Sequence, residues 1–185
     1  MIALPRRIHI TGASGSGTTT LGRSVASALA IPHHDTDDYF WKPTDPPYDD
    51  MRPAPERLRL MADMFVPRPA WVLSGSLAGW GDPLISHFDL VVFITIEKEL
   101  RLQRIRCREA ARYGAAAVAP GGARHRDTEA FVAWAAAYDE GDSVSRTRAK
   151  HEAWLATLPC PVLRLDGGRP IEELTARVVT TASQL

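Results

Sequence analysis

Residues 8–21 read Ile-His-Ile-Thr-Gly-Ala-Ser-Gly-Ser-Gly-Thr-Thr-Thr-Leu, a short apolar stretch followed by a glycine-rich turn and the start of a helical pattern. Gly12, Gly15 and Gly17 allow backbone conformations that a side chain would forbid, so successive amides can point at phosphate oxygens. A helix that begins near Gly17 adds the positive end of its dipole to the same anion. The stretch therefore predicts a phosphate-binding loop.

The loop departs from the usual pattern at one position. That pattern is Gly, four residues, Gly, Lys and then Ser or Thr, and each part meets a different piece of a nucleoside triphosphate. Thr19 occupies the hydroxyl position that would ligate Mg²⁺, whereas Thr18 replaces the lysine that spans the outer phosphates. Since a threonine hydroxyl carries no charge, the loop keeps its predicted geometry but loses its fixed cation. The predicted nucleotide contacts are made by Gly12, Ala13, Ser14, Gly15, Ser16, Gly17, Thr18, Thr19 and Thr20.

The flanking sequence supports the loop. Residues 6–11 form a strand-like run, and Leu21, Val25 and Leu29 recur at helical spacing. The rival is the Thr-Gly-x-x-x-Gly-x-Gly pattern of short-chain dehydrogenases. That pattern requires glycine where Ser16 and Thr18 stand and a later Tyr-x-x-x-Lys, which the chain lacks.

Bulk composition narrows the class of protein. The 185 residues are enough for one domain, with 22 acidic and 22 basic side chains that give no net charge. We therefore expect neither a nucleic-acid partner nor a membrane partner. Two cysteines form no disulfide framework, and no signal-like or long apolar run is present. We expect a cytoplasmic protein, either a monomer or a homodimer.

Strand-like and helix-like segments alternate along residues 1–185, which favours a single α/β domain with a parallel sheet. The proline-rich segment 42–55 is expected to be an irregular loop. The small, glycine-rich segment 114–122 is expected to be a mobile connection, and residues of about 114–140 to form a lid. The expected strands are 6–11, 31–35, 71–74, 89–96 and 160–165, and the expected helices are 17–30, 56–65, 97–113, 128–138, 144–158 and a closing helix after Pro170.

An acidic run follows the second expected strand. Ligands of open α/β sheets lie beyond the carboxyl ends of the strands, so Asp35, Asp37 and Asp38 should approach the phosphate loop. Asp37 is the first candidate and Asp35 the second for holding Mg²⁺ or for deprotonating an acceptor hydroxyl. The structural alternative is a helix cap or a solvated turn. His33 and His34 invite a metal site, but adjacent residues of a strand point to opposite faces.

Aromatic and arginine side chains offer further candidates. Tyr39, Phe40, Trp41 and Trp80 either wall an acceptor pocket or belong to the core, and the sequence leaves both open. Small residues at the end of the third strand, Ser74, Gly75 and Ser76, permit close approach of a substrate.

The helix 97–113 carries an arginine stripe, in which Arg101, Arg104, Arg108 and Arg112 fall within about 80° of arc. Arg101 and Arg106 fit a solvated face. Arg104 and Arg108 are better candidates for a phosphoryl-transfer site that lacks its lysine. Arg124 and Arg126 follow the expected mobile segment and are candidates for closing over the nucleotide.

Together these features resemble the small phosphate-loop kinases of the adenylate kinase, shikimate kinase and gluconate kinase group. The resemblance spans nearly the whole chain and rests on residues 12–19, the Asp35-x-Asp37 pair, the strand 88–94 that leads into the arginine-bearing helix, and the turn 166–173. It implies a three-layer α/β phosphate-loop NTPase fold with a five-stranded parallel sheet in the order 2-3-1-4-5 and a small helical lid.

The resemblance also implies roles for the candidate residues. ATP or GTP would bind with Mg²⁺ held by Thr19 and Asp37, the Asp-x-Asp pair would serve metal and acceptor, and Arg104, Arg108 and Arg124 would neutralise the phosphates. The turn 166–173 would lie near the adenine. Three functions stay open: a kinase for a small metabolite or nucleotide, a nucleotide sensor without catalysis, and a slow NTPase without an acceptor.

Overall fold

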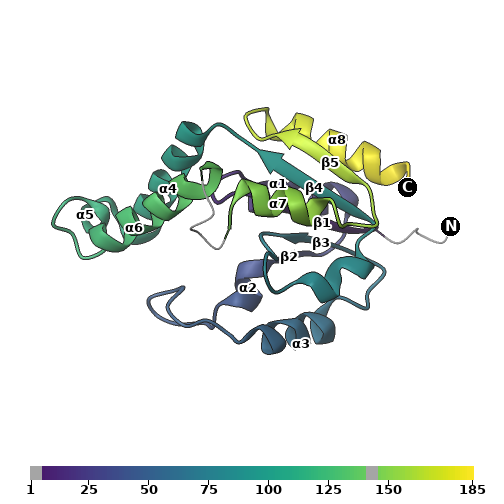
Figure 1. Cartoon of the computed structure of the whole chain (residues 1–185), viewed down its shortest axis with the longest axis horizontal. Helices are drawn as coiled ribbons and strands as arrows, with labels where there is room; N and C mark the ends of the chain where they lie inside the picture. The colour runs from purple at the N-terminus through teal and green to yellow at the C-terminus, as the bar shows by residue number, and fades with distance from the viewer. Residues whose placement is uncertain (1–5, 141–145) are drawn as a thin grey trace.

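A parallel sheet lies at the centre of the fold. The computed structural model describes residues 6–140 and 146–185. The strand order is β2-β3-β1-β4-β5 and every neighbouring pair is parallel, which confirms the predicted order (Figure 1). The strands are β1 (Arg6–Gly12), β2 (His33–Asp35), β3 (Ala70–Ser74), β4 (Leu90–Thr95) and β5 (Val162–Asp166).

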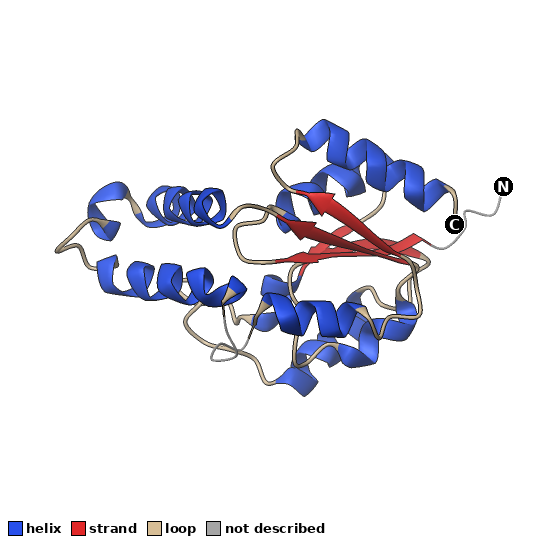
Figure 2. Cartoon of the chain, turned by 45° about the horizontal axis from the view of Figure 1, so that its top comes forward, coloured by secondary structure: helices blue, strands red, loops and turns tan. Residues whose placement is uncertain are grey.

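Helices cover both faces of the sheet, and the three layers are visible in Figure 2. No helix in the described ranges is long and apolar enough to cross a membrane. The helical segments are α1 (Thr18–Leu29), α2 (Thr36–Phe40), α3 (Ala54–Met64), the 3₁₀ segment η1 (Asp82–His87), α4 (Lys98–Tyr113), α5 (Ala115–Val118), α6 (His125–Ala136), the 3₁₀ segment η2 (Ala137–Asp139), α7 (Arg148–Leu155) and α8 (Ile171–Ser183).

Two separate hydrophobic cores follow from the alternation of side chains along each strand. On β4, Val92 and Ile94 pack into the core formed with α1 and α8, whereas Val91 and Phe93 pack into the core formed with α3 and α7. Because both faces of β4 are covered, its sequence is a continuous apolar run. The carboxyl ends of the strands are thereby held in one row, where the loop after β1 and the acidic run after β2 meet.

The predicted element boundaries differ from the structure mainly after β2. The predicted strand 31–35 is reduced to β2, and the acidic run after it forms the short helix α2. Asp35 caps that helix, because its Oδ1 accepts a hydrogen bond from the backbone N–H of Asp37 at 3.1 Å. Asp35 therefore caps α2 through Oδ1, as the structural alternative predicted, while its Oδ2 lies outside the cap and its functional role stays a prediction.

Helices α4 and α6 lie side by side and project from the sheet as an arm, with α5 at its far end (Figures 1 and 2). Ile105, Val132 and Ala135 form the buried apolar contact between them. The lid predicted at about 114–140 corresponds to α5, α6 and η2, and its movement stays a prediction. The predicted helix 144–158 begins outside the described residues, and within them α7 is shorter than expected.

Arg101 contradicts the expectation of a solvated face. Its side chain is only 1% exposed, and its guanidinium donates to the carbonyl oxygen of Ala135 and to Asp139, both at 2.6 Å. The residue therefore ties α4 to the end of α6 and to η2. The expectation failed because the helical pattern of α4 alone does not reveal that α6 covers this side.

Candidate active site

The loop between β1 and α1 has the geometry of an anion cradle. Gly15 and Gly17 have φ angles of 83° and 96°, in the left-handed region that favours glycine. A Cβ on Gly12 would lie 2.5 Å from the carbonyl oxygen of Ile94, and one on Gly15 would lie 2.6 Å from that of Arg101. Gly17 begins α1 without a side-chain cap, so the first amides of the helix keep their capacity to bind an anion.

A cavity of about 550 Å³ lies over this loop, and we call it the nucleotide cavity. Of the predicted loop contacts, Gly12, Ala13 and Ser16 are buried beneath the turn and Ser14 faces a second cavity. The residues that line the nucleotide cavity are Gly15, Gly17, Thr18, Thr19, Thr20, Arg23, His33, Asp35, Asp37, Asp38, Tyr48, Arg104, Arg108 and Arg112.

Asp35 is the carboxylate that contacts the loop. The hydroxyl of Thr19 donates to Asp35 Oδ2 at 2.7 Å, and the hydroxyl of Ser74 donates to the same oxygen at 3.3 Å. A threonine hydroxyl beside a carboxylate is a pair of hard oxygen ligands, which fits Mg²⁺ together with phosphate oxygens and water. Thr19 is thus hydrogen-bonded to Asp35, the second candidate of the sequence analysis, whereas Asp37, the first, lies two residues further on in α2, and its role as a metal ligand stays a prediction.

His33 and His34 point to opposite faces of β2, as the alternation of the strand predicted. His33 Nε2 lies 2.9 Å from Ser74 Oγ, whereas His34 stacks on Phe65 with ring centroids 4.1 Å apart. Burial lowers the pKa of both imidazoles. The described residues contain no cluster of three or more His, Cys, Asp or Glu arranged to hold a metal, which leaves the histidine metal site without support.

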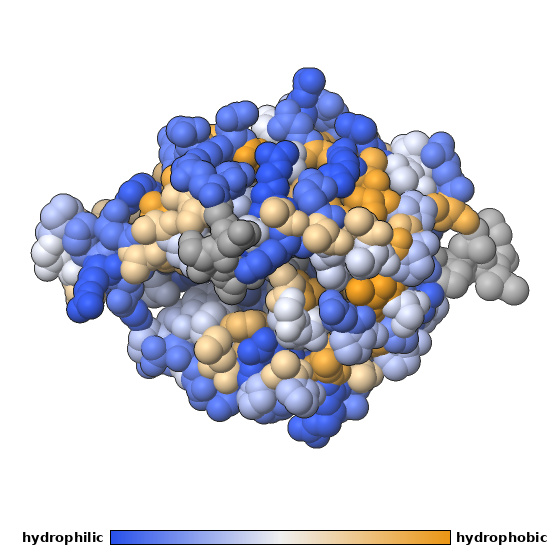
Figure 3. Space-filling view, viewed as in Figure 1, coloured by the Kyte–Doolittle hydropathy of each residue, from blue (hydrophilic) through white to orange (hydrophobic). Residues whose placement is uncertain are grey.

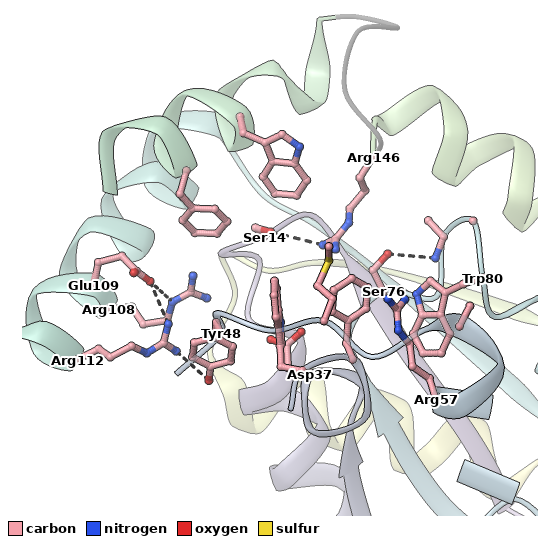
Figure 4. Close-up of a pocket in the computed structure, with 18 of the residues that line it drawn as sticks. Ser14, Asp37, Tyr48, Arg57, Ser76, Trp80, Arg108, Glu109, Arg112 and Arg146 are labelled. Atoms are coloured by element: carbon pink, nitrogen blue, oxygen red, sulfur yellow. Dashed lines mark hydrogen bonds and ion pairs between the residues drawn. The ribbon is translucent and has the colours of Figure 1, made fainter. Parts of the chain in front are cut away.

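Asp37 lies where the nucleotide cavity meets a second cavity of about 790 Å³, which we call the acceptor cavity (Figure 4). Loss of hydration and then the charge of Asp35 raise the pKa of its carboxyl, while Arg146, Arg108 and Arg112 oppose the shift. By surface area the residue is exposed, because it opens into the cavities and not into the core. Within 6–140 and 146–185 its carboxylate forms no hydrogen bond or ion pair, so it is available to a ligand.

The acceptor cavity lies between α2, the following loop and the arm, and the surface is hollowed on this side in Figure 3. Of the aromatics that the sequence left open, Tyr39 belongs to the core, whereas Phe40, Trp41 and Trp80 line the cavity. The aromatic lining is Phe40, Trp41, Tyr48, Trp80, Tyr113, Phe131 and Trp134, and the polar lining includes Ser14, Asp37, Arg57, Ser76, Arg108, Glu109, Arg112 and Arg146.

The sequence analysis singled out Ser74, Gly75 and Ser76 at the end of the third strand. Of these three described residues, only Ser76 lines the acceptor cavity. Its Oγ lies 3.5 Å from His151 Nε2, and the Nδ1 of the same imidazole lies 2.8 Å from the hydroxyl of Tyr138. Burial lowers the pKa of His151 to about 4, so the imidazole is neutral at pH 7. This chain of contacts fixes the orientation of the Ser76 hydroxyl at the cavity wall.

The arginines of the α4 stripe make different contacts. Arg104 lies beside the loop, since both terminal nitrogens of its guanidinium donate to the carbonyl oxygen of Gly167 at 3.2 Å. Arg108 and Arg112 line both cavities and share Glu109 as an ion-pair partner, at 3.2 and 3.3 Å. Arg104 and Arg108 both line the nucleotide cavity, and their part in phosphoryl transfer stays a prediction.

Arg124 lies elsewhere. It pairs with Asp127 at 3.2 Å, and its guanidinium carbon lies 4.8 Å from the centre of the Tyr113 ring. These contacts hold Arg124 on the arm, where it lines neither cavity, and its contact to a nucleotide stays a prediction.

No protein-family model matches the chain. The uncharacterized protein YqaC of Bacillus subtilis (strain 168) is 42% identical to it over 176 residues, which cover 95% of the chain and 97% of YqaC. The chain belongs to the YqaC family.

Solved structures similar to this YqaC-family chain share its fold. A gluconokinase from Sinorhizobium meliloti 1021 aligns with a TM-score of 0.53 at 17% identity, covering 98% of the chain and 93% of that protein. Shikimate kinases from Aquifex aeolicus and Bacteroides thetaiotaomicron align with TM-scores of 0.55 at 15% and 16% identity, each over 96% of the chain and over 96% and 98% of those proteins. These matches confirm the phosphate-loop kinase fold.

Several residues that line the cavities of this YqaC-family protein were missed by the sequence analysis, and two of them are arginines close to other site residues. Arg57 on α3 lies with its guanidinium carbon 3.6 Å from the centre of the Phe40 ring and 5.1 Å from that of Trp80. Arg146 precedes α7 and reaches Ser14 of the loop. Both lie in segments that the sequence analysis treated only as helix or connection. The available signal was an arginine directly before Thr147, which caps α7.

Proposed function

We propose that the protein is a kinase that transfers the terminal phosphoryl group of ATP or GTP to a hydroxyl group of a small molecule. The observation that carries the proposal is the position of Asp37, whose free carboxylate lies at the junction of the nucleotide and acceptor cavities. A nucleotide bound at the glycine loop and an acceptor in the aromatic cavity would meet at this carboxylate.

The loop and the strand ends supply the nucleotide half. The amides of the loop and of the start of α1 would hold the phosphates, because they present unpaired N–H donors to an anion. Thr19 and Asp35 would hold Mg²⁺. When bound, this ion supplies positive charge to the phosphate oxygens.

In the transfer step Asp37 acts as the general base. The acceptor oxygen forms a bond to the terminal phosphorus, the bond from that phosphorus to the bridging oxygen of the diphosphate breaks, and the proton of the acceptor hydroxyl passes to Asp37. The raised pKa of its carboxyl suits this role, because a base is most effective when its pKa approaches the working pH. Arg108 and Arg112 add positive charge around the transferring group.

A nucleotide sensor is the second candidate, and Thr18 favours it. A loop without its lysine binds phosphates through backbone amides but has no cation of its own for the transition state. A sensor, however, has no use for a second cavity with a free carboxylate at its entrance. The presence of that cavity is the reason for preferring a kinase.

An acceptor screen tests the proposal. The protein is incubated with Mg²⁺ and ATP or GTP and with hydroxyl-bearing metabolites, both aromatic and aliphatic, while diphosphate release and phosphorus NMR of the products are followed. We expect at least one acceptor to be phosphorylated by the wild type and not by Asp37→Asn, whereas Asp63→Asn on the exposed side of α3 behaves as wild type. Nucleotide binding without any acceptor-dependent turnover would support the sensor instead.

A further inference from the structure

The phosphate loop carries no cation within its own sequence. Thr18 stands at the first position of α1 and lines the nucleotide cavity, where a lysine side chain would extend over the phosphates. The charge of a bound triphosphate must therefore be met by side chains from other segments.

Arg146 reaches the loop from the opposite side. Its Nη1 donates to Ser14 Oγ at 3.4 Å, across 132 residues of sequence, and its guanidinium carbon lies 5.3 Å from the centre of the Trp134 ring. Figure 4 shows the side chain extending toward the loop between the arm and the acceptor cavity. Asp37 is the carboxylate that acts on it most strongly. Arg146 is therefore positioned over the glycine turn and beside the proposed base.

Most other cations of the site differ from Arg146 in their contacts or in their place. Among the described residues Arg23 and Arg104 also form no ion pair, but they line the nucleotide cavity and not the acceptor cavity, and the guanidinium of Arg57 lies over Phe40. Arg108 and Arg112 both pair with Glu109, and Arg124 pairs with Asp127. Arg104 donates to the neutral carbonyl oxygen of Gly167 and lines the nucleotide cavity but not the acceptor cavity. In the described part of the chain Arg146 forms no ion pair, so its charge is available to an incoming anion.

Burial disfavours the charged form of the Arg146 side chain. Loss of hydration is the largest influence on Arg146 and lowers the pKa of its guanidinium, and the negative charge of Asp37 only partly offsets it. A half-buried arginine without a paired carboxylate is stabilised when a phosphate oxygen accepts its hydrogen bonds. This behaviour fits a group that binds substrate phosphate and not one that holds the fold together.

We propose that Arg146 supplies the fixed cation that Thr18 does not, by binding the terminal phosphate of the nucleoside triphosphate from the side of Ser14. The inference deepens the proposed function, because it assigns the cation of the same nucleotide site. It differs from the sequence expectation, which placed the substitute among Arg104, Arg108, Arg124 and Arg126.

Binding of ATP and ADP distinguishes a contact to the terminal phosphate from a general effect. Calorimetry with Mg²⁺ and each nucleotide is carried out on the full chain as wild type, Arg146→Ala, Arg146→Lys and the matched control Arg148→Ala, whose arginine lies exposed at the start of α7. We expect Arg146→Ala to weaken ATP binding about 10- to 100-fold, as for a lost charge-assisted hydrogen bond, and ADP binding less than about threefold. Arg146→Lys should keep part of the ATP preference, and Arg148→Ala should match the wild type.

A double variant tests the exchange of roles. If Arg146 replaces the loop lysine, Thr18→Lys should restore the ATP preference that Arg146→Ala removes. The inference is overturned if Arg146→Ala binds ATP as well as the wild type, if it weakens ATP and ADP equally, or if the double variant binds ATP no better than Arg146→Ala. Thermal melts of all variants establish that each is folded.

Failure of the inference and failure of the proposed function give different results. A wild type that phosphorylates no acceptor, but loses its ATP preference in Arg146→Ala, would refute the kinase and retain the cation. A wild type with acceptor-dependent turnover and an unchanged ATP preference in Arg146→Ala would retain the kinase and refute the cation.

Discussion

The nucleotide cavity and the acceptor cavity differ in how their walls are drawn from the sequence. Most residues of the nucleotide cavity come from one part of the chain, residues 15–38, which holds the loop, α1, β2 and α2; α4 adds Arg104, Arg108 and Arg112. The acceptor cavity takes its walls from the loop after α2, the segment after β3, the arm and the residue before α7. The difference teaches that most of the first cavity can be recognised from one part of the sequence, whereas the second depends on how distant segments pack.

Asp37 joins the two cavities, and its loss should have the largest effect on turnover. We expect Asp37→Asn to lower kcat about 10²- to 10⁴-fold, the range of general-base catalysis, while ATP affinity changes less than about threefold. Steady-state kinetics with the acceptor found in the screen and calorimetry with ATP provide the two measurements. A loss of ATP affinity that accounts for the loss of rate would instead place Asp37 on the metal, as the sequence analysis first suggested.

The nucleotide cavity should be broken by a single methyl group. A Cβ on Gly15 would meet the carbonyl oxygen of Arg101 at 2.6 Å, and the φ angle of 83° is unfavourable for any other residue. We expect Gly15→Ala to destabilise the fold by about 1–3 kcal/mol and to abolish measurable ATP binding. Urea unfolding and calorimetry test both effects.

Gly79→Ala is the matched control, because Gly79 also has a positive φ but its added Cβ meets nothing within 4 Å. If both variants lose ATP binding to the same extent, the backbone strain and not the cradle is responsible, and the local encoding of the nucleotide cavity is disproved.

The two cavities also differ in how much of each could be predicted from the sequence. The loop was predicted because its signal, the spaced glycines, depends on neighbours in the chain, whereas the strand order followed from the resemblance to the small phosphate-loop kinases. The sequence ranked Asp37 before Asp35 as the metal ligand beside Thr19, and the structure shows a hydrogen bond from Thr19 to Asp35, a contact that a two-residue shift within the acidic run conceals until the backbone of α2 is known.

Residues of the second cavity escaped prediction for a different reason. Arg57 and Arg146 gain their roles from Phe40 and Ser14, which lie far away in sequence. Arg101 was expected on a solvated face because α6, which buries it, follows more than twenty residues later. The hydrophobic periodicity of a single helix carries no information about contacts with residues that are distant in sequence.

The dependence of the acceptor cavity on the arm is testable through Arg101. Arg101→Met removes the hydrogen bond to Ala135 and the ion pair with Asp139 while keeping an apolar side chain of similar length. We expect a loss of about 2–3 kcal/mol in the free energy of unfolding, within the range of broken buried networks. The KM of the acceptor should rise more than the Kd of ADP, because α4 and α6 both line the acceptor cavity, whereas only α4 lines the nucleotide cavity.

Arg106→Met serves as its control, since Arg106 pairs with Glu129 on the exposed surface of the same two helices. Such an exposed pair contributes little to stability because solvent screens it, so Arg106→Met should unfold much as the wild type does. Equal destabilisation by both substitutions would show that the arm is not held through Arg101.

The smallest expected effect concerns the stability cost of keeping a free carboxylate at the junction. Because the folded protein raises the pKa of Asp37, its folded state binds the proton more tightly than the unfolded chain, and stability falls as the pH rises through the folded pKa. Asp37→Asn should therefore melt slightly above the wild type at pH 7.5, and the difference should disappear below the unfolded pKa of about 3.9. Melts at pH 7.5, 5.5 and 3.5, with Asp63→Asn as control, measure it. An Asn variant that is less stable at pH 7.5 would mean that Arg146 and its neighbours hold Asp37 as a structural ion partner, and the carboxylate would then not be free for an acceptor.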